Sequence, residues 1–141
     1  MARSADEVVR LNIEEMWGKR RLELVDELVD EAYPADGHQA GPDFVRRNIA
    51  RMHAAFPDFS VDVHHLVTDG DRVAALFTQG GTHQGNFAGV EPTGRTVRFL
   101  EAGFFHVRNG MVIAADYVSD GLGARIQLGV LPDDFWTNSR R

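Results

Sequence analysis

The chain has no cysteine among its 141 residues, so it can form neither a disulfide framework nor a Cys-type zinc site, and it carries no thiolate nucleophile. It also lacks a run of about 18 apolar residues, the length that spans a membrane, and its N-terminus lacks the apolar core of a signal peptide. We therefore expect a cytoplasmic protein. The formal net charge of −6 disfavours nucleic acid or an anionic membrane as a partner.

The residue patterns of cofactor chemistry are missing as well. No set of His, Asp and Glu residues has metal-ligand spacing, and the sequence shows neither a phosphate-binding glycine loop nor a Ser-His-Asp arrangement. We therefore predict no metal, no nucleotide and no other cofactor. The length suits one domain with a substantial core, which we assign to residues 1–132, followed by a C-terminal tail at 133–141.

Apolar residues recur at helical spacing in the first part of the chain and then give way to alternation. Ser4 and Glu7 form a predicted capping box at the start of the first helix, and Pro57 ends the third. Helices followed by strands indicate an α+β fold, in which three helices packed on a strongly curved antiparallel sheet form a cone-shaped barrel with a pocket at its open end. The predicted helices cover residues 4–18, 22–29 and 42–56, and the predicted strands cover 59–68, 72–81 and a hairpin from 97 to 120.

The hairpin is the most informative segment, because Asn109-Gly110 between two apolar runs predicts a two-residue type I′ turn. That turn pairs Arg108 with Met111, and the register then runs back to place Gly103 opposite Asp116. One face of the hairpin is mostly apolar, so we expect it to be buried although it carries three acids. It comprises Val97, Phe99, Glu101, Gly103, Phe105, Val107, Val112, Ala114, Asp116, Val118 and Asp120.

Asp116 and Glu101 are the predicted catalytic residues. In this register Glu101 lies diagonal to Asp116 at roughly 7–8 Å between backbones, a distance that long side chains close. Gly103 leaves an empty space opposite Asp116. If both carboxyls are buried and close, repulsion and desolvation raise the pKa of one of them, which provides a proton donor beside a proton acceptor at neutral pH.

Five motifs, in order along the chain, resemble those of the SnoaL-like polyketide cyclases. They are AFPD at residues 55–58, GDRVA at 70–74, GGTHQG at 80–85 with PTGR at 92–95, NGMV at 109–112, and Asp120 with QLG at 127–129. The resemblance extends from about residue 5 to 132. It implies the cone-shaped fold of the nuclear transport factor 2-like superfamily and the activity of a cofactor-independent cyclase.

The resemblance also points to individual positions. Trp17 matches an aromatic pocket position and Asn48 matches a pocket position on the third helix. The family's acid/base Asp falls one residue after Asp116, on Tyr117, so either residue could take that role. The predicted substrate contacts are Trp17, Tyr33, His38, Asn48, Gly103, Tyr117 and Asp120; each has a plainer alternative, such as a core aromatic for Trp17, a surface position for His38 or a helix cap for Asp120.

These residues lead us to expect a cyclase that acts on a small-molecule polyketide intermediate in bacterial secondary metabolism, such as antibiotic biosynthesis. The cone would fold the substrate, Asp116 helped by Glu101 would move a proton, and Asn48 or Tyr117 would bind the developing oxyanion. Three alternatives stay open. They are pericyclic ring closure by shape alone, epoxide opening by a water held between Glu101 and Asp116, and a non-catalytic ligand-binding module.

The opposite face of the hairpin is also apolar. It carries Leu100, Phe104, Ile113 and Tyr117, and such a surface is too apolar to face water. We therefore predict a homodimer through this face.

Overall fold

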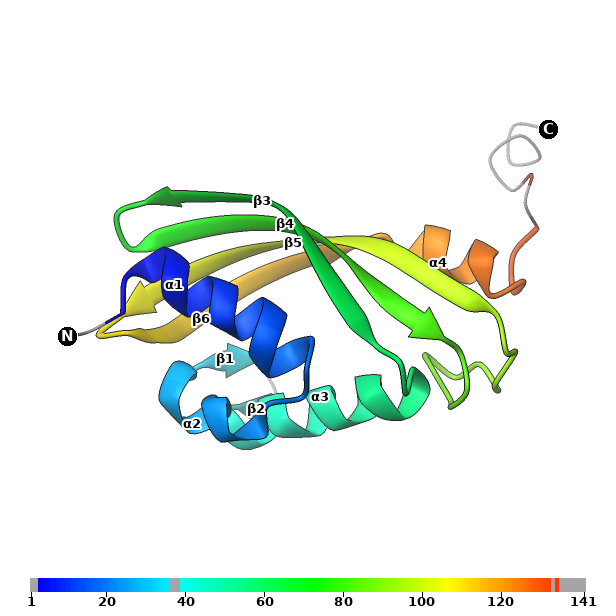
Figure 1. Cartoon of the computed structure of the whole chain (residues 1–141), viewed down its shortest axis with the longest axis horizontal. Helices are drawn as coiled ribbons and strands as arrows, with labels where there is room; N and C mark the ends of the chain where they lie inside the picture. Colours follow the sequence, from blue (N-terminus) through cyan, green and yellow to red (C-terminus); the bar gives the residue numbers. More distant parts are fainter. Residues whose placement is uncertain (1–2, 36–38, 133, 135–141) are drawn as a thin grey trace.

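The computed structural model of the chain describes residues 3–35, 39–132 and 134. One curved antiparallel sheet, in the strand order β3-β4-β5-β6, covers a layer of helices (Figure 1). The α+β class and the curved sheet are as predicted. The elements are α1 (Ala5–Arg10), η1 (Leu11–Trp17), η2 (Leu22–Leu24), α2 (Val25–Leu28), β1 (Pro34–Ala35), β2 (Gln39–Ala40), α3 (Pro42–Ala55), β3 (Ser60–Asp69), β4 (Arg72–Thr82), β5 (Thr96–Arg108), β6 (Met111–Ser119) and α4 (Gly121–Gln127).

The helices begin and end close to the predicted positions, with two differences. The capping box is wrong, because the side chain of Ser4 makes no hydrogen bond to the start of α1. The first helix also changes type after Arg10 and continues as the π-helix η1. Pro42 opens α3, where its fixed φ suits the first helical turn, and the helix ends before Phe56 and Pro57.

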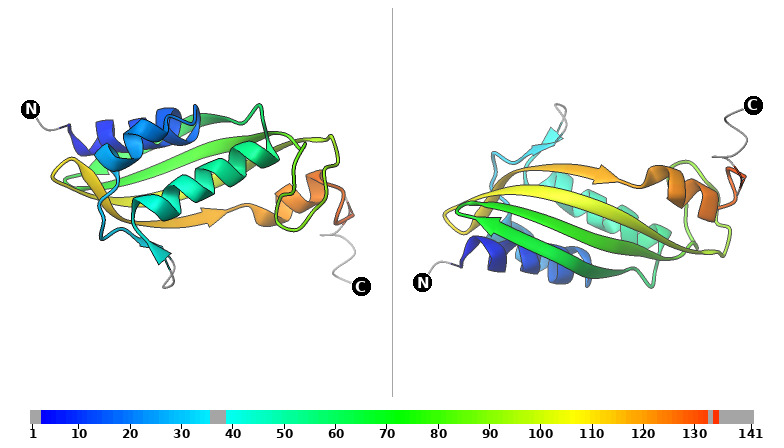
Figure 2. Two further views of the ribbon diagram at one scale, coloured as in Figure 1. Left: turned by 90° about the horizontal axis from the view of Figure 1, so that it is seen from below. Right: turned by 90° about the horizontal axis from the view of Figure 1, so that it is seen from above.

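The core lies between the helices and the concave face of the sheet. The two views of Figure 2 show α1, α2 and α3 on one side of the sheet. The larger cluster joins α1, η1, α2 and α3 to the middle of the sheet, and a smaller one joins the end of α3 to β5 and α4. Burial of these apolar side chains is the main source of stability. Representative members are Val8, Val9, Ile13, Met16, Leu28, Ile49, Phe77 and Phe105 in the larger cluster, and Phe56, Val97, Phe99 and Leu128 in the smaller.

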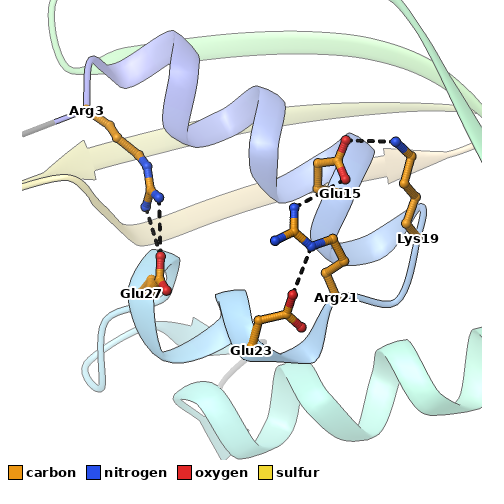
Figure 3. Close-up of polar contacts among 6 residues, drawn as sticks. All are labelled: Arg3, Glu15, Lys19, Arg21, Glu23 and Glu27. Atoms are coloured by element: carbon orange, nitrogen blue, oxygen red, sulfur yellow. Dashed lines mark hydrogen bonds and ion pairs between the residues drawn. The ribbon is translucent and has the colours of Figure 1, made fainter.

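Ion pairs connect the helical segments on the outside of this layer (Figure 3). Glu15 accepts from Lys19 at 2.9 Å and also lies 3.5 Å from Arg21. The neighbouring lysine holds the pKa of Glu15 below its usual value. Similar contacts join Arg21 to Glu23 and Arg3 to Glu27. Because solvent screens exposed pairs of this kind, they contribute little to the stability of the fold.

The GGTH segment has a structural role at the end of β4. Gly80 has φ +144°, and a Cβ there would lie 1.8 Å from the carbonyl oxygen of Val97. His83 is fully buried, and its Nδ1 accepts from the backbone N–H of Thr93 at 3.1 Å. The N–H of Gly94 donates to the carbonyl of His83 at 2.8 Å. These contacts close the connection between β4 and β5, which explains the glycines and the histidine of the motif.

The hairpin turn is confirmed, and the predicted register holds for the first two pairs but is wrong beyond them. Asn109 and Gly110 have φ of 52° and 74°, as a type I′ turn requires, and Arg108 pairs with Met111. The ladder then passes from Val107–Val112 to His106–Ala114, which leaves Ile113 without a partner. Because side chains alternate along a strand, one extra residue moves every later β6 side chain to the other face.

The shift reverses the predicted roles of neighbouring β6 residues. Tyr117 now lies opposite Gly103 on the concave face, and Asp116 lies opposite Phe104 on the outer face. The space at Gly103 is therefore not empty. The rings of Phe105 and Tyr117 occupy it, since a Cβ there would lie 2.7 Å from the first and 3.2 Å from the second.

Candidate functional site

A cavity of about 190 Å³, here called the central hollow, lies between the helices and the concave face of the sheet. Helix η1, helix α3 and all four long strands contribute to its walls, so it depends on the whole fold. Most of the wall is apolar or aromatic, which suits a largely apolar ligand held by few polar groups. The lining residues are Asn12, Ile13, Trp17, Met52, Val61, Phe77, Gln79, Glu101 and Tyr117.

Glu101 is the only carboxyl group among the described residues that line the central hollow. It lies on β5 opposite Ser119, whose hydroxyl donates to Oε1, and the buried Gln79 donates from Nε2 to Oε2 at 2.9 Å. Burial raises the pKa of the Glu101 carboxyl, and the two hydrogen bonds oppose this rise. A carboxyl held in a fixed orientation beside an apolar cavity, with an elevated pKa, is a stronger base than an ordinary glutamate and is suited to proton transfer.

Tyr117 is the second ionisable group of the central hollow. Its ring meets that of Phe105 edge-on, with centroids 5.6 Å apart. Burial, followed by the nearby Tyr33 and Glu101, raises the pKa of Tyr117 well above its usual value. The residue keeps 40% of its surface exposed, so it is also open to an incoming ligand. Its hydroxyl therefore stays protonated at neutral pH, and it would donate to a ligand by exchanging its hydrogen bond with Tyr33.

Asp116 does not reach this cavity, so its predicted placement is wrong. It is exposed on the outer face, where it borders a depression that also includes Phe104 and His106. The cause is the unpaired Ile113, which shifts the register by one residue. The predicted pair of facing carboxylates does not exist, and the raised pKa of Glu101 comes from burial rather than from a neighbouring acid.

The predicted substrate contacts are divided between the central hollow and other places. Trp17 lines the central hollow. The buried Tyr33 does not line it but interacts with Tyr117, which does. Asn48 instead lines a separate open depression of about 670 Å³, which shares Trp17 with the central hollow. His38 lies outside the described residues.

Two further predicted contacts have structural roles. Gly103 is buried beneath the rings of Phe105 and Tyr117 and offers no side chain to a ligand. Asp120 caps α4, accepting from the backbone N–H of Gly123 at 2.8 Å, and it lines no part of the central hollow. The alternative that the sequence left open for Asp120, a helix cap, is the observed one.

The sequence analysis missed three polar residues of the site. Gln79 lies two residues after Phe77 on β4, so the two-residue period of a strand could have placed it on the same buried face. Ser119 faces Glu101 only because of the register shift. Asn12 lies between Leu11 and Ile13 in a run that predicts a core helix, and nothing in that pattern singles it out.

The elevated pKa of Glu101 leads to a first prediction. In a protein labelled with ¹³C at glutamate carboxyls, the signal missing from Glu101→Gln should titrate above the usual glutamate value. Because the folded pKa exceeds the unfolded one, the free energy of unfolding should fall as pH rises from the unfolded pKa through the folded pKa. Glu101→Gln should lose this part of the pH dependence. Titration of that signal at or below the usual value would contradict the assignment.

No group of three or more His, Asp or Glu side chains in ranges 3–35 and 39–132 is arranged to hold a metal ion. Within the described part of the chain, no helix has both the length and the apolar character needed to cross a membrane.

Comparison with known proteins agrees with the fold. The sequence model of the SnoaL-like polyketide cyclases matches residues 7–128. The chain belongs to this family. No relative among curated proteins matches it.

Three solved structures illustrate the likeness. TsrD from Streptomyces laurentii has a TM-score of 0.81 at 22% identity, covering 89% of this chain and 94% of that chain. AclR from Streptomyces galilaeus, a candidate hydroxylase, has a TM-score of 0.78 at 24% identity, covering 97% and 92%. IdmH from Streptomyces antibioticus, a candidate polyketide cyclase, has a TM-score of 0.75 at 25% identity, covering 90% and 99%. The family and fold inferred from the motifs are thus confirmed.

Proposed function

We propose that the protein is a cofactor-independent cyclase that closes a ring in a polyketide intermediate of bacterial secondary metabolism, with Glu101 as the acid/base group. The observation that carries this proposal is the buried Glu101 carboxyl facing an otherwise largely apolar cavity. The cavity would hold a flexible substrate with its reacting carbons close together, which removes much of the entropic barrier to ring closure. Membership of the SnoaL-like family supports the same class of reaction.

The proton transfers follow from the two ionisable groups of the central hollow. Glu101, in its ionised form, removes a proton from the carbon beside a substrate carbonyl, and Tyr117 donates a hydrogen bond to the enolate oxygen that results. The enolate carbon then attacks a second carbonyl of the same molecule and forms the new carbon–carbon bond. The alkoxide formed in this step takes back the proton from Glu101, so the enzyme returns to its starting state.

Gln79 and Ser119 are the positioning residues of this scheme. Each occupies one oxygen of the Glu101 carboxylate, so the side chain keeps one orientation toward the cavity. Each bond also stabilises the ionised form, which can act as a base, against the effect of burial. A fixed base needs no reorientation at the moment of reaction.

Epoxide opening loses its structural basis, because Asp116 and Glu101 lie on different faces of the hairpin and cannot hold a water between them. Ring closure by shape alone is the second candidate. It is favoured by the aromatic and aliphatic residues that form most of the cavity wall, among them Trp17, Met52 and Phe77. It differs from the proposed mechanism in requiring no proton transfer by Glu101.

The proposal can be tested with a synthetic aromatic β-keto ester that carries a ketone acceptor in the same molecule and closes slowly in buffer. The wild-type protein should accelerate formation of the aldol ring product, followed by chromatography with mass detection. It should also favour one ring stereochemistry, since a folded cavity presents one face of the acceptor. Ring closure at the buffer rate with a racemic product, across a panel of such esters, would contradict cyclase activity.

We further propose that the outer face of the sheet forms a homodimer. Figure 2 shows that no helix in the described part of the chain covers this face. Four large apolar side chains project from it, with exposed fractions of 43% for Leu100, 57% for Phe104, 66% for Val67 and 69% for Val118. Two ion pairs, Arg98–Asp62 and His106–Asp71, lie toward its ends, and the exposed Asp116 lies beside Phe104. A largely apolar patch of this kind fits a second copy of itself. Tyr117, predicted on this face, lies on the other one, and Ile113 is the unpaired residue of the shift.

The dimer leads to a second prediction. Light scattering after size exclusion should show the wild type as a dimer and Phe104→Glu as a monomer, because a buried unpaired charge strongly destabilises an interface. Val130→Glu is the matched control, since Val130 is 50% exposed but lies outside the sheet. It should remain dimeric. A monomeric wild type at micromolar concentration would contradict the proposed interface.

A further inference from the structure

Among the described residues, two buried side-chain polar atoms have no hydrogen-bond partner, Oδ1 of Asn12 and Nε2 of His83, and of the two residues only Asn12 lines the central hollow. Only 4% of the surface of Asn12 is exposed. An unpaired buried amide oxygen costs free energy, so folded proteins rarely keep one without a reason. The same side chain lines the central hollow, opposite the sheet that carries Glu101.

The local backbone explains how Asn12 comes to face the cavity. It lies in the π-helix η1, in which the N–H of Gly18 donates to the carbonyl of Ile13, five residues earlier, at 3.0 Å. In an α-helix, residues five apart point about 140° away from each other. The wider turn of the π-helix brings Trp17 round toward the side of Asn12, so both line the same cavity. π-helical turns are rare and occur frequently at functional sites.

Three other polar side chains of the central hollow have partners within the fold. Gln79 donates to Glu101, Glu101 also accepts from Ser119, and Tyr117 interacts with Tyr33. Among the lining residues, Asn12 is the one with a buried acceptor that has no hydrogen-bond partner. Once the amide turns this oxygen from the wall toward the cavity, a ligand hydroxyl directed at η1 would satisfy it.

We propose that Asn12 binds a hydroxyl group of the ligand, either phenolic or enolic, and so sets the orientation of the ring system against Glu101. The inference builds on the proposed function, because the hydroxyl contact from the helix side would hold the reacting carbon at the carboxylate on the sheet side. It names the substrate class more closely: a flat, largely apolar molecule with a hydrogen-bond donor at the end that meets η1. Asn12 is in this sense a positioning and specificity residue.

The stability of the free protein separates this role from a structural one. Replacing Asn12 with Leu, which has a similar volume, removes the unpaired oxygen and adds apolar surface to the core. The melting temperature should therefore stay equal or rise. A side chain retained for the fold alone would give a lower melting temperature when removed.

The binding test uses 2-naphthol and 2-methoxynaphthalene, which share a ring system but differ in the donor hydroxyl. Titration calorimetry should show that Asn12→Leu weakens naphthol binding about tenfold, as expected for a lost hydrogen bond in a dry site, and leaves the methyl ether unchanged. Equal binding of naphthol to the wild type and to Asn12→Leu would overturn the proposal. An equal loss for both probes would overturn it as well, because Asn12 would then act as a donor or as a packing group.

Two additional variants keep the result interpretable. If Asn12→Leu does not fold, Asn12→Ala replaces it under the same binding criteria. Asp116→Asn should bind naphthol as the wild type does, since Asp116 lies on the outer face of the sheet. If Asn12→Leu loses selectivity for naphthol and Glu101→Gln still cyclises the substrate fully, the Asn12 contact is supported and the proposed function is rejected. If Asn12→Leu keeps its selectivity and Glu101→Gln loses cyclisation, only the Asn12 contact is rejected.

Discussion

Replacing Glu101 with Gln is expected to lower kcat for ring closure by about 10²–10⁴-fold, the range that a positioned general base contributes. The amide keeps the size of the side chain and can still contact Gln79 and Ser119, so the cavity should keep its shape. It cannot accept the substrate proton. KM should change little, because the ring system is held mostly by the apolar wall.

The matched control is Asp116→Asn. It makes the same chemical change on the same hairpin, but on the outer face, where the carboxyl is exposed. Its kcat should stay within about twofold of the wild type, since surface substitutions away from a site have small effects. A large loss in Asp116→Asn with a small one in Glu101→Gln would show that the catalytic carboxyl was assigned to the wrong face.

The second large effect concerns stability. Gly80→Ala should lower the free energy of unfolding by about 3–5 kcal/mol, because a Cβ at this position would lie 1.8 Å from the carbonyl oxygen of Val97 and 2.8 Å from its carbonyl carbon. Those atoms belong to the backbone of β5, which is held by its pairing with β4. The strand can relieve the clash only by separating the sheet next to the site. Urea denaturation followed by circular dichroism measures the loss.

Gly70→Ala distinguishes this clash from the general cost of a positive φ. Gly70 has φ +60° in the turn between β3 and β4, and a Cβ there would meet nothing within 4 Å. Its replacement should cost about 1–2 kcal/mol, the penalty of a left-handed conformation. If the two variants lose equal stability, the close approach at Gly80 does not carry the effect.

Much of the fold could be predicted because its signals are local. Pro42 and Pro57 mark the ends of α3, and Asn109-Gly110 determines the turn of the hairpin. The orientation of Glu101 toward the concave face also follows from the alternation of side chains along β5, because the pairing of β5 with β4 has no register shift. Because these features depend on a few neighbouring residues, they can be predicted without knowledge of the tertiary structure.

The β6 side of the site could not be predicted, because its orientation depends on one unpaired residue. Ile113 is neither Gly nor a turn residue, so nothing in the sequence predicts the register shift that places Asp116 on the outer face and Tyr117 on the concave face. What the shift gains is the packing of the Tyr117 ring in the space above Gly103, and this contact exists only in the folded structure. The π-helical turn that directs Asn12 into the cavity is missed for a similar reason, since its sequence reads as an ordinary amphipathic helix.

Proton abstraction by Glu101 can be measured directly, without knowing the natural substrate. The flat ketone 2-tetralone, incubated with the protein in D₂O, exchanges the protons beside its carbonyl, and the loss of their signals in ¹H NMR gives the rate. The wild type and Asp116→Asn should accelerate this exchange equally above the buffer rate, and Glu101→Gln should return it to the buffer rate. Equal acceleration by the wild type and Glu101→Gln, or no acceleration by the wild type, would contradict the assignment of Glu101 as the base.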